Sequence, residues 1–264
     1  MRITPHFLWC LCPANRASKP PHQAVAELTR PRTVGRLVAA LAMGAVCTWV
    51  MMRAAQSGWA DFNALQAEQL VNLRIKDGQA MDGMLLARAQ ALLETAVAWN
   101  PGNGSAHENL VVVHRMALLL PDIGFAERDQ HVNAALTHAL KAAVLRPTSG
   151  YAYSLVALAK QTRGQRDSVF RQALSQAARF GPWEPGVQKN IIDAGSQGWE
   201  ALDEPGREVV RLTIVRTQEA YPDDARTFLL ARRWTLPNCT ELRIPVAGIC
   251  PGKAGTSSEL QSRN

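Results

Sequence analysis

The stretch VNAALTHALKAAVLRPTSGYAYSLVALAKQTRGQRDSVFRQALSQAARFGP, residues 132–182, decides the fold of this chain. Apolar side chains recur every three or four positions over residues 132–144, 151–161 and 169–180, which is the period of a helix with one buried face. Proline or glycine follows each segment within three residues, and both interrupt a helix. The stretch therefore predicts three short helices joined by tight turns.

The same period continues on both sides of that stretch. It predicts five further helices, over residues 85–97, 107–119, 187–199, 209–221 and 225–234. No segment alternates apolar and polar residues with the period of two that marks a strand. The predicted fold class is therefore all-α.

The predicted helices form pairs that repeat along the chain. The second helix of a pair is rich in small residues and ends near a proline, at positions 101, 147, 182 and 222. These prolines are 46, 35 and 40 residues apart, near the 34-residue period of the tetratricopeptide repeat. Such pairs bury their apolar faces only by stacking. Residues 82–238 are therefore predicted to form a tetratricopeptide-like helical-hairpin solenoid, with residues 56–81 as a linker or first helix.

One segment before the repeats is apolar enough for a membrane. Residues 37–52, LVAALAMGAVCTWVMM, carry no charge and lie between Arg36 and Arg53. With the flanking small residues, and with both arginines reaching toward the interfaces, the segment approaches the roughly 20 residues that span a bilayer. We predict one transmembrane signal-anchor helix over residues 34–55. A buried helix of a soluble domain and a cleaved signal peptide are the alternatives.

The distribution of charge predicts the orientation of the span. The formal net charge is +7, from 29 Lys and Arg against 22 Asp and Glu. Residues 1–36 contain six Lys or Arg and a single Glu, so a net +5 precedes the span and the rest of the chain carries +2. Positive residues stay on the cytoplasmic side, which predicts a cytoplasmic N-terminus and residues 54–264 across the membrane. The remaining +2 gives no reason to expect a nucleic-acid partner.

Both ends of the chain are predicted to lack a regular fold. Residues 1–33 are basic and interrupted by prolines, and residues 239–264 have the composition of an irregular tail. Cys239 and Cys250 stand eleven positions apart in that tail. On the exported side they could form a disulfide worth about 2–3 kcal/mol, or they could be two unrelated thiols.

Four short motifs resemble the VpsP family of bacterial polysaccharide-biosynthesis proteins. They are LRPT at 145–148, YAY at 151–153, FRQAL at 170–174 and the distinctive turn Gly181, Pro182, Trp183, Glu184, Pro185. The resemblance covers residues 82–239. It implies one span in the bacterial inner membrane, a tetratricopeptide-like periplasmic domain and a role in exopolysaccharide biosynthesis. The long basic segment before the span departs from the family pattern, and the family has no established catalytic residues to carry over.

The sequence carries no catalytic or cofactor motif. It lacks G-x-S-x-G, a P-loop, G-x-G-x-x-G and H-E-x-x-H, so we predict a non-enzymatic protein without a cofactor. His107 and His114 lie seven residues apart on one predicted helix, as do His131 and His138 on the next. Four histidines on adjacent helices could bind a metal in a bundle core. Histidines in such places more often pack, cap or face solvent, and no metal site is predicted.

The first helix of each pair lines the concave face of a tetratricopeptide solenoid. Counted from the repeat register, that face is predicted to carry Glu108, Arg115, Tyr151, Gln161, Lys189 and Asp193. Their mixed charge suits a peptide or protein partner better than a polyanion.

These features predict a membrane-anchored scaffold that holds protein components of an exopolysaccharide synthesis and export complex together in the periplasm. The alternative is an accessory factor of the same pathway that binds or modifies the polysaccharide, with Trp183 or Trp199 stacking on a sugar ring. A third function, a regulator facing the cytoplasm, requires the opposite orientation.

Overall fold

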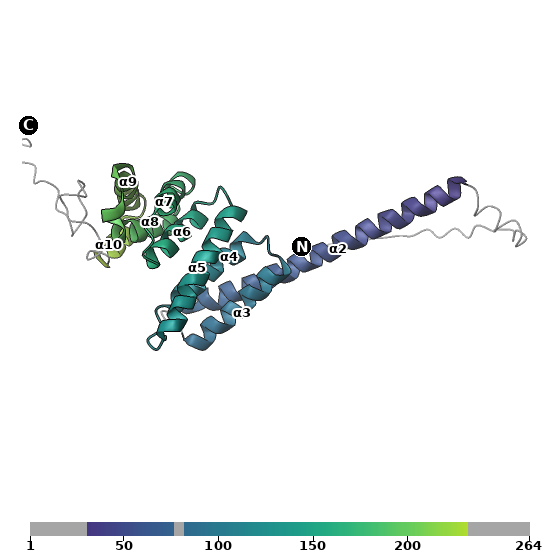
Figure 1. The fold of residues 1–264 in the computed structure, drawn as a ribbon, viewed down its shortest axis with the longest axis horizontal. Helices are drawn as coiled ribbons and strands as arrows, with labels where there is room; N and C mark the ends of the chain where they lie inside the picture. Colours follow the sequence, from purple (N-terminus) through teal and green to yellow (C-terminus); the bar gives the residue numbers. More distant parts are fainter. Residues whose placement is uncertain (1–30, 77–81, 232–264) are drawn as a thin grey trace, which may run out of the picture. The chain divides into compact units, whose positions relative to one another are not determined.

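Every regular element that the computed structural model describes, over residues 31–76 and 82–231, is a helix (Figure 1). The elements are α2 (Pro31–Lys76), α3 (Gly83–Trp99), α4 (Gly104–Ala117), α5 (Phe125–Leu145), α6 (Gly150–Thr162), α7 (Ser168–Phe180), α8 (Pro185–Gln197), the 3-10 turn η1 (Trp199–Ala201), α9 (Glu204–Ala220) and α10 (Pro222–Ala231). The all-α prediction is confirmed for these residues. Most of the basic N-terminal segment, the tail at 239–264 and the Cys239–Cys250 pair lie outside them.

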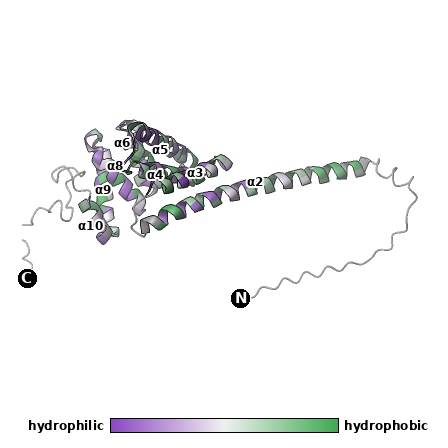
Figure 2. Cartoon of the chain, turned by 90° about the horizontal axis from the view of Figure 1, so that it is seen from below, coloured by the Kyte–Doolittle hydropathy of each residue, from purple (hydrophilic) through white to green (hydrophobic). Residues whose placement is uncertain are grey.

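The chain divides into two compact units, Met1–Ala55 and Gln56–Asn264. Within the first unit, α2 contains the apolar segment predicted to span a membrane. Among the described helices, α2 is the one long and apolar enough to do so, with a mean hydropathy of 1.7 over its most apolar window. No residue of that window is buried, and Figure 2 shows hydrophobic residues along this part of the helix. A core helix of a soluble domain would be mostly buried, whereas a transmembrane anchor and a signal peptide are both consistent with this exposure.

Short polar residues begin most of the helices in the second unit. The side chains of five N-cap residues accept a hydrogen bond from the backbone N–H three positions on, at 2.7–3.1 Å: Asp82, Asn103, Ser149, Asp167 and Asp203. Such caps satisfy an N–H group that the helix itself leaves unpaired. α8 begins instead with Pro185, whose missing N–H is tolerated in the first turn.

Several boundaries differ from those that periodicity predicts, most of all the starts of α5 and α9, and α9 begins at Glu204, five residues before the predicted start. α5 begins at Phe125, seven residues before the apolar repeat, because residues 125–130 are helical but exposed on all sides. An exposed turn has no buried face and therefore leaves no apolar period in the sequence. α8 ends at Gln197, and Trp199 belongs to the separate turn η1.

Two clusters of buried apolar residues hold the second unit together. The smaller joins the end of α2 to α3 and α4 and includes Ala60, Ala67, Val71, Leu86, Leu93 and Leu110. The larger extends from α4 to α10, with the fully buried Phe170 among its members. The part of α2 from Gln56 onward therefore packs as the first helix of this unit.

Consecutive helices pack as pairs, α4 with α5, α6 with α7 and α8 with α9. The first helices of these pairs also contact one another, α4 with α6 and α6 with α8. Side chains of the predicted binding face therefore come from neighbouring helices.

Candidate functional site

Hydrogen bonds between side chains connect the first helices α6 and α8. Asn190 of α8 donates to Ser154 of α6 at 3.0 Å, and Gln161 of α6 donates to Gln197 of α8 at 3.0 Å. Gln161, one of the six residues predicted for the binding face, is thus held at the C-terminal end of both helices. Its amide is already partnered within the domain.

Glu108 of α4 is buried and connects α4 to the α5–α6 turn. Its carboxylate pairs with Arg146 and accepts a hydrogen bond from the Ser149 hydroxyl at 3.2 Å. Burial raises the pKa of Glu108, while Arg146 and Ser149 act to lower it. Asp193 of α8, also predicted for the binding face, is likewise buried. These two carboxylates offer little surface to a partner.

Tyr151, in the first turn of α6, lies between residues of α4 and α8. Two of its ring carbons lie 3.4 and 3.7 Å from the point that a Cβ on Gly186 of α8 would occupy, so the glycine allows close contact between the ring and α8. Burial raises the pKa of the Tyr151 hydroxyl, with Glu108 acting in the same direction and Arg115 against it. The structure thus brings three of the predicted residues, Glu108, Arg115 and Tyr151, into one electrostatic neighbourhood.

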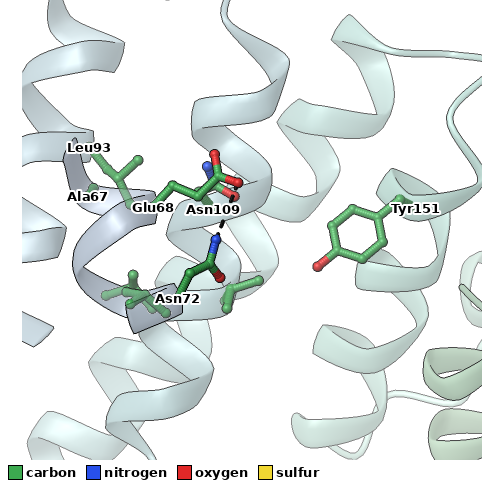
Figure 3. Close-up of a pocket in the computed structure, with 9 residues that line it drawn as sticks. Ala67, Glu68, Asn72, Leu93, Asn109 and Tyr151 are labelled. Carbon is green, nitrogen blue, oxygen red and sulfur yellow. Dashed lines mark hydrogen bonds between the residues drawn. The ribbon is translucent and has the colours of Figure 1, made fainter. Parts of the chain in front are cut away.

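A cleft of about 390 Å³ lies on one side of Tyr151. It is lined by Ala67, Glu68, Val71 and Asn72 of α2, Leu93 of α3, Asn109, Val112 and Val113 of α4, and Tyr151 itself. Figure 3 shows the Tyr151 hydroxyl pointing toward Glu68, Asn72 and Asn109 across the open space. Polar groups therefore line a cleft whose floor is otherwise apolar.

A second cleft, of about 310 Å³, lies farther along the chain, between α8, α9 and α10. Its walls are Pro185, Gly186, Gln188 and Lys189 of α8, Thr217 of α9, Tyr221 at the C-cap of α9, and Ala225 of α10. Lys189 is the residue predicted for the binding face that lines this second cleft, and it is exposed. Because Tyr151 lines the first cleft and contacts Gly186 in the second, it separates the two.

The Gly-Pro-Trp-Glu-Pro motif forms the turn between α7 and α8. Gly181 caps α7, Glu184 precedes α8, and Trp183 between them is 56% exposed. The Arg216 guanidinium lies 5.8 Å from the centroid of the Trp183 ring, and the Tyr221 hydroxyl donates to the Trp183 carbonyl at 3.0 Å. The turn is therefore held against α9 and its C-cap residue, beside the second cleft.

Three polar residues of the first cleft were not predicted from the sequence: Glu68, Asn72 and Asn109. Glu68 and Asn72 lie in the segment interpreted as a linker or first helix, and Asn72 donates to Glu68 at 3.5 Å. Their spacing of four on a helix was the available signal. Asn109 directly follows the predicted Glu108 and points into the cleft, whereas Glu108 does not line it (Figure 3).

No metal-binding group was found in the described part of the chain. Over residues 31–76 and 82–231, no three or more His, Cys, Asp or Glu side chains are placed to hold one metal ion. The four histidines instead pair with one another between α4 and α5.

Comparison of the chain with protein-family models and with curated proteins gave no match. The fold therefore defines the class of protein: an all-helical chain of packed helix pairs, with one helix long and apolar enough to cross a membrane. Its candidate site is the face of α4, α6 and α8 with the two clefts.

Proposed function

We propose that this chain is a single-pass membrane protein whose helical domain binds a protein partner along α4, α6 and α8. The two clefts on either side of Tyr151 carry this proposal. Two clefts separated by one aromatic side chain suit a polypeptide segment with two anchoring side chains better than one small molecule.

The order of helix contacts supports a tetratricopeptide-like solenoid. α4 and α6 each contact their own second helix and the next first helix, and α8 contacts its own second helix α9, as stacked hairpins do. In such a stack the first helices line one continuous face, which here is the face that holds both clefts. Because stacking places both clefts on this face, we expect the partner to bind there.

Exopolysaccharide biosynthesis is the proposed setting. The support is the sequence resemblance to the VpsP family, together with the charge pattern that favours an exported domain. Of the residues that line the first cleft, Glu68 is the single carboxylate, so a pair for acid–base chemistry on a glycan is missing there. These observations favour a scaffold at the bacterial inner membrane over a glycan-modifying enzyme.

The predicted orientation, with a cytoplasmic N-terminus and an exported domain, can be tested with reporters fused after Asn264. Alkaline phosphatase, which needs export to form its disulfides, is expected to be active there, and green fluorescent protein is expected to be dark. A reporter placed before Arg36 serves as the control and is expected to show the reverse pattern. Activity of the cytoplasmic reporter at Asn264 would reject the periplasmic domain.

The proposed binding face predicts which positions of the chain crosslink to a partner. A photo-crosslinking residue at Asn109, in the first cleft, is expected to capture a product of the polysaccharide gene cluster in cells that express it. The matched site is Thr137, which is exposed on α5 away from both clefts and is expected to capture none. Combining Asn109 crosslinking with Tyr151→Ala is expected to lower capture about tenfold, as loss of a central aromatic anchor does.

Three results would contradict the proposal: equal capture at both positions, capture unchanged by Tyr151→Ala, or captured proteins unrelated to the polysaccharide. The Tyr151→Ala protein must retain its helical circular dichroism for the comparison to hold.

Glycan binding is the second candidate function, and the exposed Trp183 favours it. Trp183 as a residue is 56% exposed, and its indole could stack on a sugar. Trp199 could not, since it is only 2% exposed. Retention of the purified full-length protein on immobilised polysaccharide, lost on Trp183→Ala, would favour this function over the scaffold.

A further inference from the structure

Four histidines form a continuous ladder between α4 and α5. The Nδ1 atoms of His107 and His138 lie 2.8 Å apart, and so do those of His114 and His131. The rings of His114 and His138 stack between these two pairs, with their centroids 5.8 Å apart. Seven-residue spacing on two antiparallel helices places one pair directly after the other.

Each Nδ1–Nδ1 hydrogen bond requires at least one ring of the pair to be neutral. One ring donates its Nδ1–H, and the other must present an unprotonated Nδ1 to accept it. When both rings are protonated, two N–H groups and two positive charges face each other and the hydrogen bond is lost. The ladder is therefore stable only while at least one histidine of each pair stays neutral.

The protein surroundings of the ladder favour the neutral form of its histidine rings. His107 and His114 are only 5% and 4% exposed, although a backbone hydrogen bond to Pro101 acts to raise the pKa of His107. Burial lowers the pKa of His107, His114 and His138, and that of His114 falls to about 4, with the charges of His131 and His138 acting in the same direction.

The charged groups that face the ladder come from α3 and α5. Glu94 of α3 favours protonation of His138, whereas Lys141 of α5 opposes protonation of His107. The Glu127 carboxylate of α5 lies 3.8 Å from Nε2 of His131. Four further titratable groups lie on α4, on α6 and in the turn between α5 and α6. They interact electrostatically with one another instead: Glu108, Arg115, Tyr151 and Arg146. The two glutamates cannot offset protonation of all four rings.

We propose that this ladder is an acid-sensitive latch, which holds α4 against α5 near neutral pH and loosens the helix pair as the histidines become protonated. The proposal does not depend on the identity of a partner. α4 also carries Asn109 and Val112 of the first cleft, so loosening of the pair would change that cleft.

The sign of the pH effect follows from the direction of the pKa shifts. A histidine with a lowered pKa in the folded state gives its full stability above its ordinary value of about 6.5. That stability is lost as the pH falls from about 6.5 toward the folded-state pKa, about 4 for His114. By pH 5.5, His114 alone is expected to lower the equilibrium constant for closing the helix pair about tenfold, since each pKa unit is a factor of ten.

Hydrogen exchange of the full-length protein in lipid nanodiscs tests the latch. Protection factors, corrected for the intrinsic pH dependence of exchange, are compared at pH 7.5 and pH 5.5. Amides of α4 and α5 are expected to lose at least tenfold in protection, while those of α7 and α9 are expected to change little. Equal protection of α4 and α5 at both pH values would reject the proposal.

Two variants assign the effect to the ladder. His114→Asn with His131→Asn keeps a donor and an acceptor near the Nδ1 positions and removes two titrating rings, so the pH effect on α4 and α5 is expected to shrink about tenfold. His6→Gln with His22→Gln removes the two histidines outside the ladder and is expected to leave the full effect. The reverse pattern would show that the ladder is not the sensor.

A measurement on the unaltered side chains decides the question if the asparagine variant fails to fold. Imidazole nitrogen chemical shifts in the His6→Gln, His22→Gln protein report the four ladder rings alone. At least one ring of each pair is expected to stay neutral at pH 6 and to become protonated only at lower pH. Independent titration of all four near pH 6.5 would overturn the latch.

Discussion

Replacing Phe170 with alanine is expected to lower the free energy of unfolding of the helical domain by about 3–5 kcal/mol, which is a large part of the stability of a domain. Phe170 is completely buried in the larger apolar cluster. Two of its ring carbons lie only 2.7 and 2.9 Å from the point that a Cβ on Gly198 would occupy, so the ring is packed directly against the end of α8. Removing the ring leaves a cavity that α7 and α8 cannot close without moving.

Urea unfolding of the full-length protein in detergent, followed by circular dichroism, measures this loss. Phe125 is the matched control, because it is the same residue type at the start of a helix but is 89% exposed. Phe125→Ala is expected to change the free energy of unfolding by less than about 0.5 kcal/mol. Equal losses for the two variants would show that Phe170 is not a core residue.

The second large effect is expected from Gly150→Ala, which should destabilise the domain by about 2–3 kcal/mol. A Cβ at position 150 would lie 2.5 Å from the backbone nitrogen of Gly181 and 2.7 Å from its Cα. These are backbone atoms at the end of α7, so no side chain can rotate away. The methyl group must push the start of α6 from the end of α7.

Gly83→Ala provides the control for that substitution. Gly83 begins α3 just as Gly150 begins α6, but the nearest atom to its Cβ position is Leu120 Cδ1 at 3.7 Å, an ordinary contact. Alanine is expected to be neutral there or to stabilise by up to about 1 kcal/mol, because it restricts the unfolded chain. A gain of stability at Gly150 would contradict the close approach of α6 and α7.

The helices themselves could be predicted from the sequence because their signals are local. Apolar residues at a period of 3.6 mark the buried face of α7, for example, and Asp167 before it supplies the cap. The exposed first turns of α5 have no buried face and were missed for that reason. The apolar, charge-free segment within α2 is equally local, and its length and composition are enough to indicate a span.

The candidate site could be predicted only in part. The repeat register indicated Tyr151 and Lys189, which line the clefts, but it also indicated Glu108 and Asp193, which are buried. Neighbouring positions on a helix differ by about 100° in direction, so an error of one residue exchanges a buried side chain for an exposed one. Asn109 rather than Glu108 lines the cleft for this reason.

The sequence by itself determined that this chain is helical, where most of its helices begin and end, and which segment is apolar enough for a membrane. Each of these depends on residues within a few turns of one another. Only the tertiary structure decided which histidines pair, since His107 and His138 are 31 residues apart and His114 and His131 are 17 apart. It also decided that the end of α2 forms a wall of the first cleft. Contacts of this kind depend on the register between packed helices, which local sequence patterns do not encode.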